Sequence, residues 1–147
     1  MLFTSTFALL LTAIINLSAA QEDCSRNYTI VAGDTCDRIC QSQGVSNYQL
    51  GRVNPQIDAN CDNLVPGQVI CLGIIGQDCT ETHTVTGGET CISITGDAGI
   101  GLDVFMCNNP NIDANCDNLD IDNVVCVAAD TIYPDTCPSD EPALFVQ

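Results

Sequence analysis

The sequence predicts an α+β protein that is built from two small β-α-α-β units in tandem. The main observation is an internal repeat, since residues 54–64 and 109–119 agree at ten of eleven positions at an offset of 55. With the same offset, 19 of the 48 positions from Cys24 to Cys71 are identical in the second copy. Four cysteines keep their register across the offset, which indicates a duplicated structural unit.

The elements of the first unit follow from local signals. Residues 28–31 are a β-branched and aromatic run, which is typical of a short strand. Gly33 and Thr35 supply a turn and a cap, so a helix is expected over residues 36–43, ending at Gly44. A second helix, a loop and a closing strand are expected at residues 45–53, 57–64 and 69–72.

The second unit repeats this order with a weaker helical pattern. Strands are expected at residues 84–85 and 124–127, and helices from Cys91 onward and at residues 102–106. Glycines interrupt the first of these helical stretches, and each costs about 1 kcal/mol relative to alanine inside a helix. The two units are separated only by a short linker, which should hold them close together.

The chain begins with an apolar segment that is typical of a secretory signal peptide. The small residues Ser18 and Ala20 precede a suitable cleavage point, although no Lys or Arg precedes the apolar run, so a membrane anchor is the alternative. The predicted organisation is a signal peptide, two units and an irregular tail that is partly held by Cys137, at residues 1–20, 24–73, 79–127 and 128–147.

All eleven cysteines follow the predicted signal peptide, a content typical of a secreted disulfide scaffold. Three connectivities exist within each unit. Strand alternation turns Cys71 towards the open face of the sheet, where Cys24 can meet it, and this leaves Cys36 with Cys61. The counterpart pairs in the second unit are Cys79 with Cys126 and Cys91 with Cys116.

Three cysteines have no counterpart in the other unit, namely Cys40, Cys107 and Cys137. Two of them could form a fifth bridge, and the third then stays free or joins two chains. The net charge of −16, with three cationic residues against 19 acidic ones, disfavours nucleic acid and anionic membrane as partners, because both are bound by clustered cations. A neutral ligand such as a sugar remains compatible with this surface.

Both units carry the same ordered set of short motifs. The first has Gly-Asp-Thr-Cys at 33–36, Asn-Pro at 54–55, Pro-Gly-Gln at 66–68 and Val-Ile-Cys at 69–71. The second has Gly-Glu-Thr-Cys at 88–91, Asn-Asn-Pro at 108–110 and Val-Val-Cys at 124–126. Found twice at equal spacing, this set resembles the lysin motif (LysM) in its cysteine-containing fungal form.

The resemblance implies units in which two helices cover a two-stranded antiparallel sheet. It also implies binding of N-acetylglucosamine oligomers in a shallow groove between two loops, without enzyme activity or a cofactor. The first groove would be formed by Gly33, Asp34, Thr35 and Cys36 with Asn54, Pro55, Gln56, Ile57 and Asp58. The second would be formed by Gly88, Glu89, Thr90 and Cys91 with Asn109, Pro110, Asn111, Ile112 and Asp113.

The chemistry of the ligand fits such a groove. In a β-1,4-linked N-acetylglucosamine chain every second acetamide points to the same side, so backbone groups can bind the amides while Ile57 takes an acetyl methyl. Two grooves on one chain could gain by avidity. The first groove is expected to be the better one, because Pro66-Gly67-Gln68 becomes Ile121-Asp122-Asn123 and Asp34 becomes Glu89 in the second copy.

Several features have simpler explanations. The copied block could be retained because a tight loop needs its turn and disulfide residues. Its acidic part only faintly resembles a calcium loop, since Asn63 and Val69 stand where such a loop has Gly and Glu. No metal site is predicted, and His83 is expected to be a packed or surface residue. Asn27 begins an N-glycosylation acceptor sequence.

The sequence therefore predicts a secreted, extracellular and non-catalytic protein that binds chitin oligomers or cell-wall chitin. By resemblance, it would sequester chitin fragments or shield the fungal wall from host immunity. The alternative is a disulfide-rich interaction protein, similar to an inhibitor, that has lost sugar binding. The binding module of a chitin-active enzyme is a third reading. Dimers bridged by the ligand or by the odd cysteine are left open.

Overall fold

The computed structural model describes residues 23–137, and the predicted signal peptide and the end of the tail lie outside this range. The first unit consists of β1 (Cys24–Thr29), α1 (Cys36–Gln43), α2 (Asn47–Val53) and β2 (Val69–Ile74). The second consists of β3 (Thr82–Thr84), α3 (Cys91–Ala98), α4 (Leu102–Asn108) and β4 (Val124–Cys126). The predicted α+β class and the repeated β-α-α-β order are confirmed.

Helix boundaries follow the capping residues seen in the sequence. The Thr35 side chain accepts a hydrogen bond from the backbone N–H of Arg38, and Gly44 ends α1 in the left-handed conformation. Ser46 caps α2 in the same way. Despite its glycines, the first helix of the second unit forms, because a capping box at Thr90 starts it and Gly99 ends it.

Each unit has its own two-stranded antiparallel sheet, β1 with β2 and β3 with β4. Ile70 and Leu72 of β2 are buried in the core of the first unit. The expectation that Cys71 lies on an open face is wrong, because its side chain is fully buried in the disulfide with Cys24.

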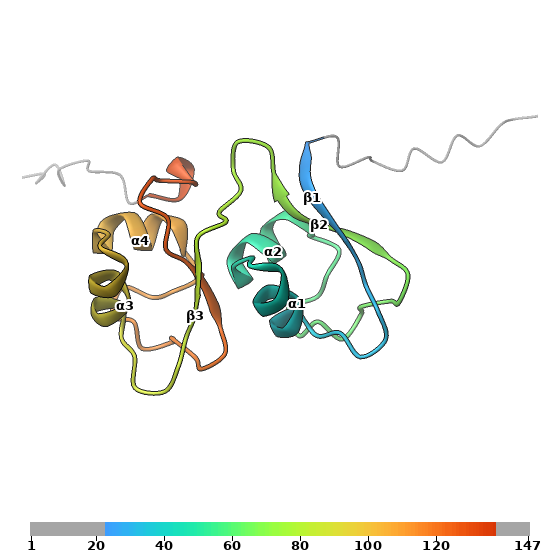
Figure 1. Ribbon diagram of the computed structural model, residues 1–147, viewed down its shortest axis with the longest axis horizontal. Helices are drawn as coiled ribbons and strands as arrows, with labels where there is room; N and C mark the ends of the chain where they lie inside the picture. The colour runs from blue at the N-terminus through green and yellow to red at the C-terminus, as the bar shows by residue number, and fades with distance from the viewer. Residues whose placement is uncertain (1–22, 138–147) are drawn as a thin grey trace, which may run out of the picture.

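The helices of the first unit also cover the sheet of the second, so the two units form one layered body (Figure 1). Val125 packs into the core of the second unit, whereas its neighbour Val124 points the other way and joins the core of the first. The contact is fixed by hydrogen bonds, since Asn47 Oδ1 accepts from the Val124 N–H at 2.7 Å and Gln41 donates to the Asp122 carbonyl at 3.0 Å.

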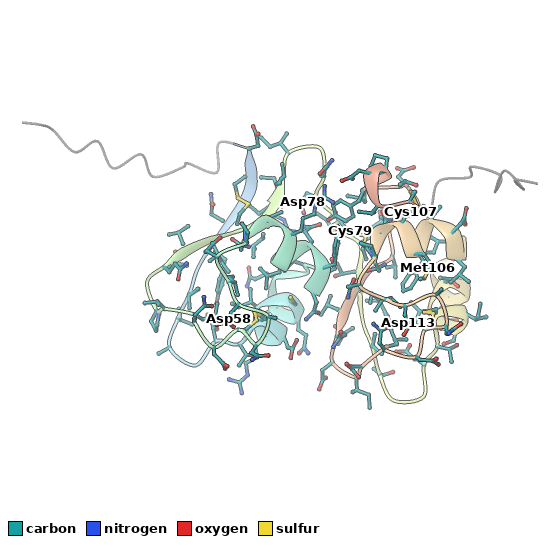
Figure 2. The ribbon with its side chains drawn as sticks, turned by 180° about the vertical axis from the view of Figure 1, so that it is seen from behind. Asp58, Asp78, Cys79, Met106, Cys107 and Asp113 are labelled. Atoms are coloured by element: carbon teal, nitrogen blue, oxygen red, sulfur yellow. A yellow bond between two sulfur atoms is a disulfide. The ribbon has the colours of Figure 1, made fainter. Side chains whose placement is uncertain are left out.

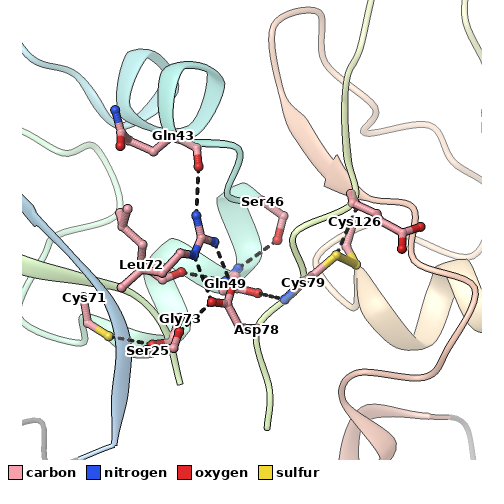
Figure 3. A network of polar contacts seen from close by, with 12 residues as sticks. Ser25, Gln43, Ser46, Gln49, Cys71, Leu72, Gly73, Asp78, Cys79 and Cys126 are labelled. Carbon is pink, nitrogen blue, oxygen red and sulfur yellow. Dashed lines mark hydrogen bonds and ion pairs between the residues drawn. A yellow bond between two sulfur atoms is a disulfide. The ribbon is translucent and has the colours of Figure 1, made fainter. Parts of the chain in front are cut away.

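A buried glutamine joins the units at the connecting segment. Gln49 Nε2 donates to the Leu72 carbonyl at 2.6 Å and to Asp78 at 2.8 Å, while its Oε1 accepts from the Cys79 N–H at 2.8 Å (Figure 3). Partial burial opposes ionisation of Asp78, but hydrogen bonds from Arg26, Ser25 and Gln49 outweigh it and lower its pKa. The ionised carboxylate thus links β1, α2 and the connecting segment.

The tail returns from the second unit to the first. A short 3-10 helix, η1 (Pro134–Thr136), follows Tyr133, whose side chain is buried and whose hydroxyl donates to Gln49 Oε1. Arg52 lies over the Tyr133 ring at 4.9 Å and forms an ion pair with Asp135 at 3.1 Å. This part of the predicted irregular tail is therefore ordered against α2.

Five disulfides staple the chain. The two pairs in each unit are those that strand alternation favoured, Cys24–Cys71 and Cys36–Cys61 in the first unit and Cys79–Cys126 and Cys91–Cys116 in the second. A fifth bridge joins Cys107 of α4 to Cys137. The remaining thiol, Cys40, is buried, and burial raises its pKa to about 12. It therefore presents no thiolate at the surface through which two chains could be linked.

Residues 23–137 show neither a membrane-spanning helix nor a metal-binding cluster. No helix between residues 23 and 137 is long and apolar enough to cross a membrane. Within the same range, His, Cys and acidic side chains do not gather into a group that could hold a metal ion.

Candidate binding groove

A hollow of about 230 Å³ opens between α2 and the loop that follows it in the first unit. The Cys36–Cys61 disulfide ties this loop to the start of α1, with the two Cα atoms 6.0 Å apart. Of the residues predicted for the groove, Cys36, Ile57 and Asp58 line the hollow. The others are not among its lining residues, and several are held in structural contacts.

The helix α2 supplies the part of the hollow that the sequence did not reveal. Leu50 and Gly51 line it from the helix, and Ala59 and Cys61 line it from the loop. A methyl group built on Gly51 would meet no other atom within 4 Å, so the absence of a side chain leaves free space there. The sequence offered little indication of this lining, because a glycine inside a helix adds no side chain to the helical pattern.

Asn47 forms one end of the hollow and is fixed on two sides. Its amide donates to Asp37 on α1 at 2.9 Å, and its oxygen accepts from the Val124 N–H of the second unit at 2.7 Å. A side chain held by two bonds keeps one orientation. The second unit therefore shapes the hollow of the first.

Asn54 lies beneath the loop rather than in its binding face. Its side chain is fully buried, where it donates to the carbonyls of Leu50 and Cys71 and accepts from the Cys71 N–H at 2.9 Å. Asn109 makes the same contacts with Phe105 and Cys126. These two asparagines bind the loop to the closing strand, which places them outside reach of a ligand.

The acidic residue in the loop before the first helix of each unit also accepts hydrogen bonds from within the unit. Asp34 accepts hydrogen bonds from the Tyr28 hydroxyl at 2.9 Å and from the Val31 N–H at 2.8 Å. Glu89 repeats the arrangement with His83 at 3.0 Å and the Thr86 N–H. His83 thus replaces Tyr28 as the partner of the loop carboxylate, which gives the one histidine a structural role.

This pair yields a prediction for pH dependence. The hydrogen bond from His83, together with the Thr86 N–H, lowers the pKa of Glu89 to about 2. Because an unfolded glutamate has a pKa of about 4.3, the stabilisation is complete above that value and is lost as the pH falls towards 2. Replacing His83 with Phe should raise the Glu89 pKa towards its usual value, as measured by NMR titration of the side-chain carboxyl carbon. An unchanged titration would show that His83 does not hold the carboxylate.

The sequence of the first unit matches a known domain family. Residues 28–73 match the LysM domain family over strands, helices and the loop that borders the hollow. The first unit is a LysM domain.

Proteins that match 71% to 72% of this chain carry the same family name. The chain is 27% identical over 129 residues to secreted LysM effector LysM1 of Trichophyton rubrum, covering 72% of this chain and 51% of that protein. It is 28% identical to secreted LysM effector ldpA of Aspergillus fumigatus, covering 71% and 38% of the two chains, and 28% identical to Blys8 of Beauveria bassiana, covering 71% and 34%. The chain thus spans a third to a half of the length of these relatives.

The copied block of the LysM domain owes its residues to loop geometry. Cys61 has a φ of +59° and Cys116 a φ of +61°, which is the left-handed region. Asp58 accepts from the Asp62 N–H at 3.0 Å, and Asn63 donates to the Gln56 carbonyl at 2.7 Å. The second unit repeats both bonds, so much of the identity between the two blocks keeps a turn that sets Ile57 beside the hollow.

The remaining predicted residues lie around the loops. Gly33 and Gly88 are exposed with positive φ, Thr35 and Thr90 cap helices, and Pro55, Gln56, Pro110 and Asn111 are exposed. In the second unit Cys91 and Ile112 are buried, whereas their counterparts Cys36 and Ile57 are only partly buried. Asp113 accepts from two backbone N–H groups of its own loop.

Proposed function

We propose that this protein is a secreted, non-catalytic chitin-binding protein whose first LysM domain takes N-acetylglucosamine oligomers. The observation that carries the proposal is the hollow between α2 and the disulfide-tied loop. Its lining is mainly apolar, from Leu50, Ile57, Ala59 and the Cys36–Cys61 bridge. An apolar floor in a shallow groove suits the acetyl methyl group of N-acetylglucosamine, which the glucose units of cellulose lack.

The rest of the surface supports a neutral ligand. The net charge of −16 opposes polyanions, whereas an uncharged oligosaccharide is not repelled. Polar groups at the rim of the hollow, Asn47 and Asp58, already hold one orientation through their own hydrogen bonds. A preformed groove of this kind loses little conformational entropy when it binds.

The biological role that we propose follows from the relatives, which are named secreted LysM effectors. A protein that captures soluble chitin fragments, or coats wall chitin, would shield the fungal wall from host immunity. We include in the proposal a second LysM domain over residues 79–127 and a glycan on Asn27, whose side chain is exposed on β1.

Isothermal titration calorimetry with chitohexaose and cellohexaose tests the function. We expect heat with chitohexaose and none with cellohexaose, because only the former carries acetamides. No heat with either sugar would favour the alternative, a disulfide-rich interaction protein. Equal heat with both would show that the acetyl group is not recognised and would contradict the proposed groove.

A further inference from the structure

The two units differ at one position that decides whether the hollow is open. Gly51 of α2 corresponds to Met106 of α4 in the aligned copies, and Leu50 corresponds to Phe105. Met106 is partly buried and packs against the core cluster of the second unit, to which Ile112 belongs. Figure 2 shows Met106 on the same side of its unit as the loop that carries Asp113. A four-atom side chain therefore stands where the first domain has none.

Burial around the two positions supports the same conclusion. Ile57, which borders the hollow, is partly exposed, whereas Ile112 retains only 4% of its exposure. The disulfide partner Cys36 is likewise partly exposed, whereas Cys91 retains 1%. The two loops share the left-handed cysteine and the same two side-chain bonds, so we attribute the difference in burial to the helix position.

We propose that the residue at this helix position selects the binding unit, so that only the first domain, with Gly51, binds an N-acetylglucosamine chain. Met106 fills the corresponding space of the second unit. This inference rests on the proposed function. The second unit instead supports the first, since its Val124 N–H fixes Asn47 at the end of the hollow. The near-identical loops then mark a shared fold rather than two equal sites.

Gly51 can be replaced without strain. It lies inside α2 without a positive φ, and an added Cβ meets open space. Methionine also has a helix propensity higher than that of glycine by up to about 1 kcal/mol, so Gly51→Met should fold at least as well as the parent. A loss of binding in this variant is therefore not a loss of fold.

The experiment is an NMR titration of the ¹⁵N-labelled protein with chitotetraose. In the parent, amide shifts are expected at residues 57–59 and not at 112–114. Gly51→Met should weaken binding by tenfold or more. The matched control is Gly96→Met, which makes the same change at an exposed helical glycine with open space in the second unit. It should bind like the parent.

The reciprocal variants Met106→Gly and Met106→Ala should add shifts at residues 112–114, and the alanine variant serves if glycine weakens α4. Parent shifts in both loops, or an undiminished affinity of Gly51→Met, would overturn the inference and leave the proposed function standing. A folded Met106 variant without new shifts would also overturn it. A parent that shows no shifts at all would overturn both.

Discussion

Replacing Asn54 with aspartate is expected to lower the free energy of unfolding by more than about 3 kcal/mol. The Asn54 amide donates to the Leu50 carbonyl at 2.9 Å and to the Cys71 carbonyl at 2.6 Å, and none of the side chain is exposed. In the variant, a carboxylate oxygen faces these two carbonyl oxygens in a fully buried site. Asparagine and aspartate are nearly equal in size, but the substitution still destabilises the fold because it removes both hydrogen-bond donors and buries a charge.

Guanidinium denaturation followed by far-ultraviolet circular dichroism measures the effect. Asn60→Asp is the matched control, since it places the same charge in the same loop at an exposed position and should change stability by less than about 0.5 kcal/mol. Equal midpoints for the two variants would mean that the Asn54 side chain is not a structural tie. Asn54 would then again be a candidate ligand-binding residue, as the motif suggested.

The elements and staples of this fold could be predicted from the sequence because they depend on local or duplicated patterns. Thr35 caps the start of α1 and Gly44 ends it, and both act through hydrogen bonds to residues only a few positions away. Strand alternation favoured the cysteine pairs of the first unit, and the duplication repeats them in the second, with the same separations of 47 and 25 residues. A copied loop also predicts a copied turn.

The direction of side chains within the loop could not be predicted in the same way. Asn54 and Ile57 are both identical in the two copies, yet the first lies under the loop and the second borders the hollow. Which side chain points inward depends on the strand that lies beneath the loop. The lining from α2 was missed for a related reason, because Gly51 contributes by having no side chain.

The packing of the two units against each other could not be predicted from the internal repeat. Val69 and Val124 are the same residue at the same place in the two copies, but Val69 is 57% exposed and Val124 is 3% exposed. The second sheet has the helices α1 and α2 of the first unit against β4. A duplication makes sequences equal, whereas a tandem arrangement gives the two copies different neighbours.

The joint between the units supplies the second large effect, since Gln49→Leu is expected to lower the free energy of unfolding by about 4 kcal/mol. The variant keeps the apolar bulk but leaves the buried Cys79 N–H and Leu72 carbonyl without this partner, at about 1 to 3 kcal/mol for each group. Asp78 and the Tyr133 hydroxyl also lose a contact.

Gln49 corresponds to Val104 in the second unit, so the duplication does not repeat this joint. Gln41→Leu is the control, because Gln41 also joins the units, through one bond at 3.0 Å, but is exposed, and its loss should cost less than about 0.5 kcal/mol. Residual dipolar couplings add a second readout. The parent should fit one alignment tensor, and Gln49→Leu should need two. A single tensor with parental stability would show that the units are held together without Gln49, through the Val124 contact and the η1 segment alone.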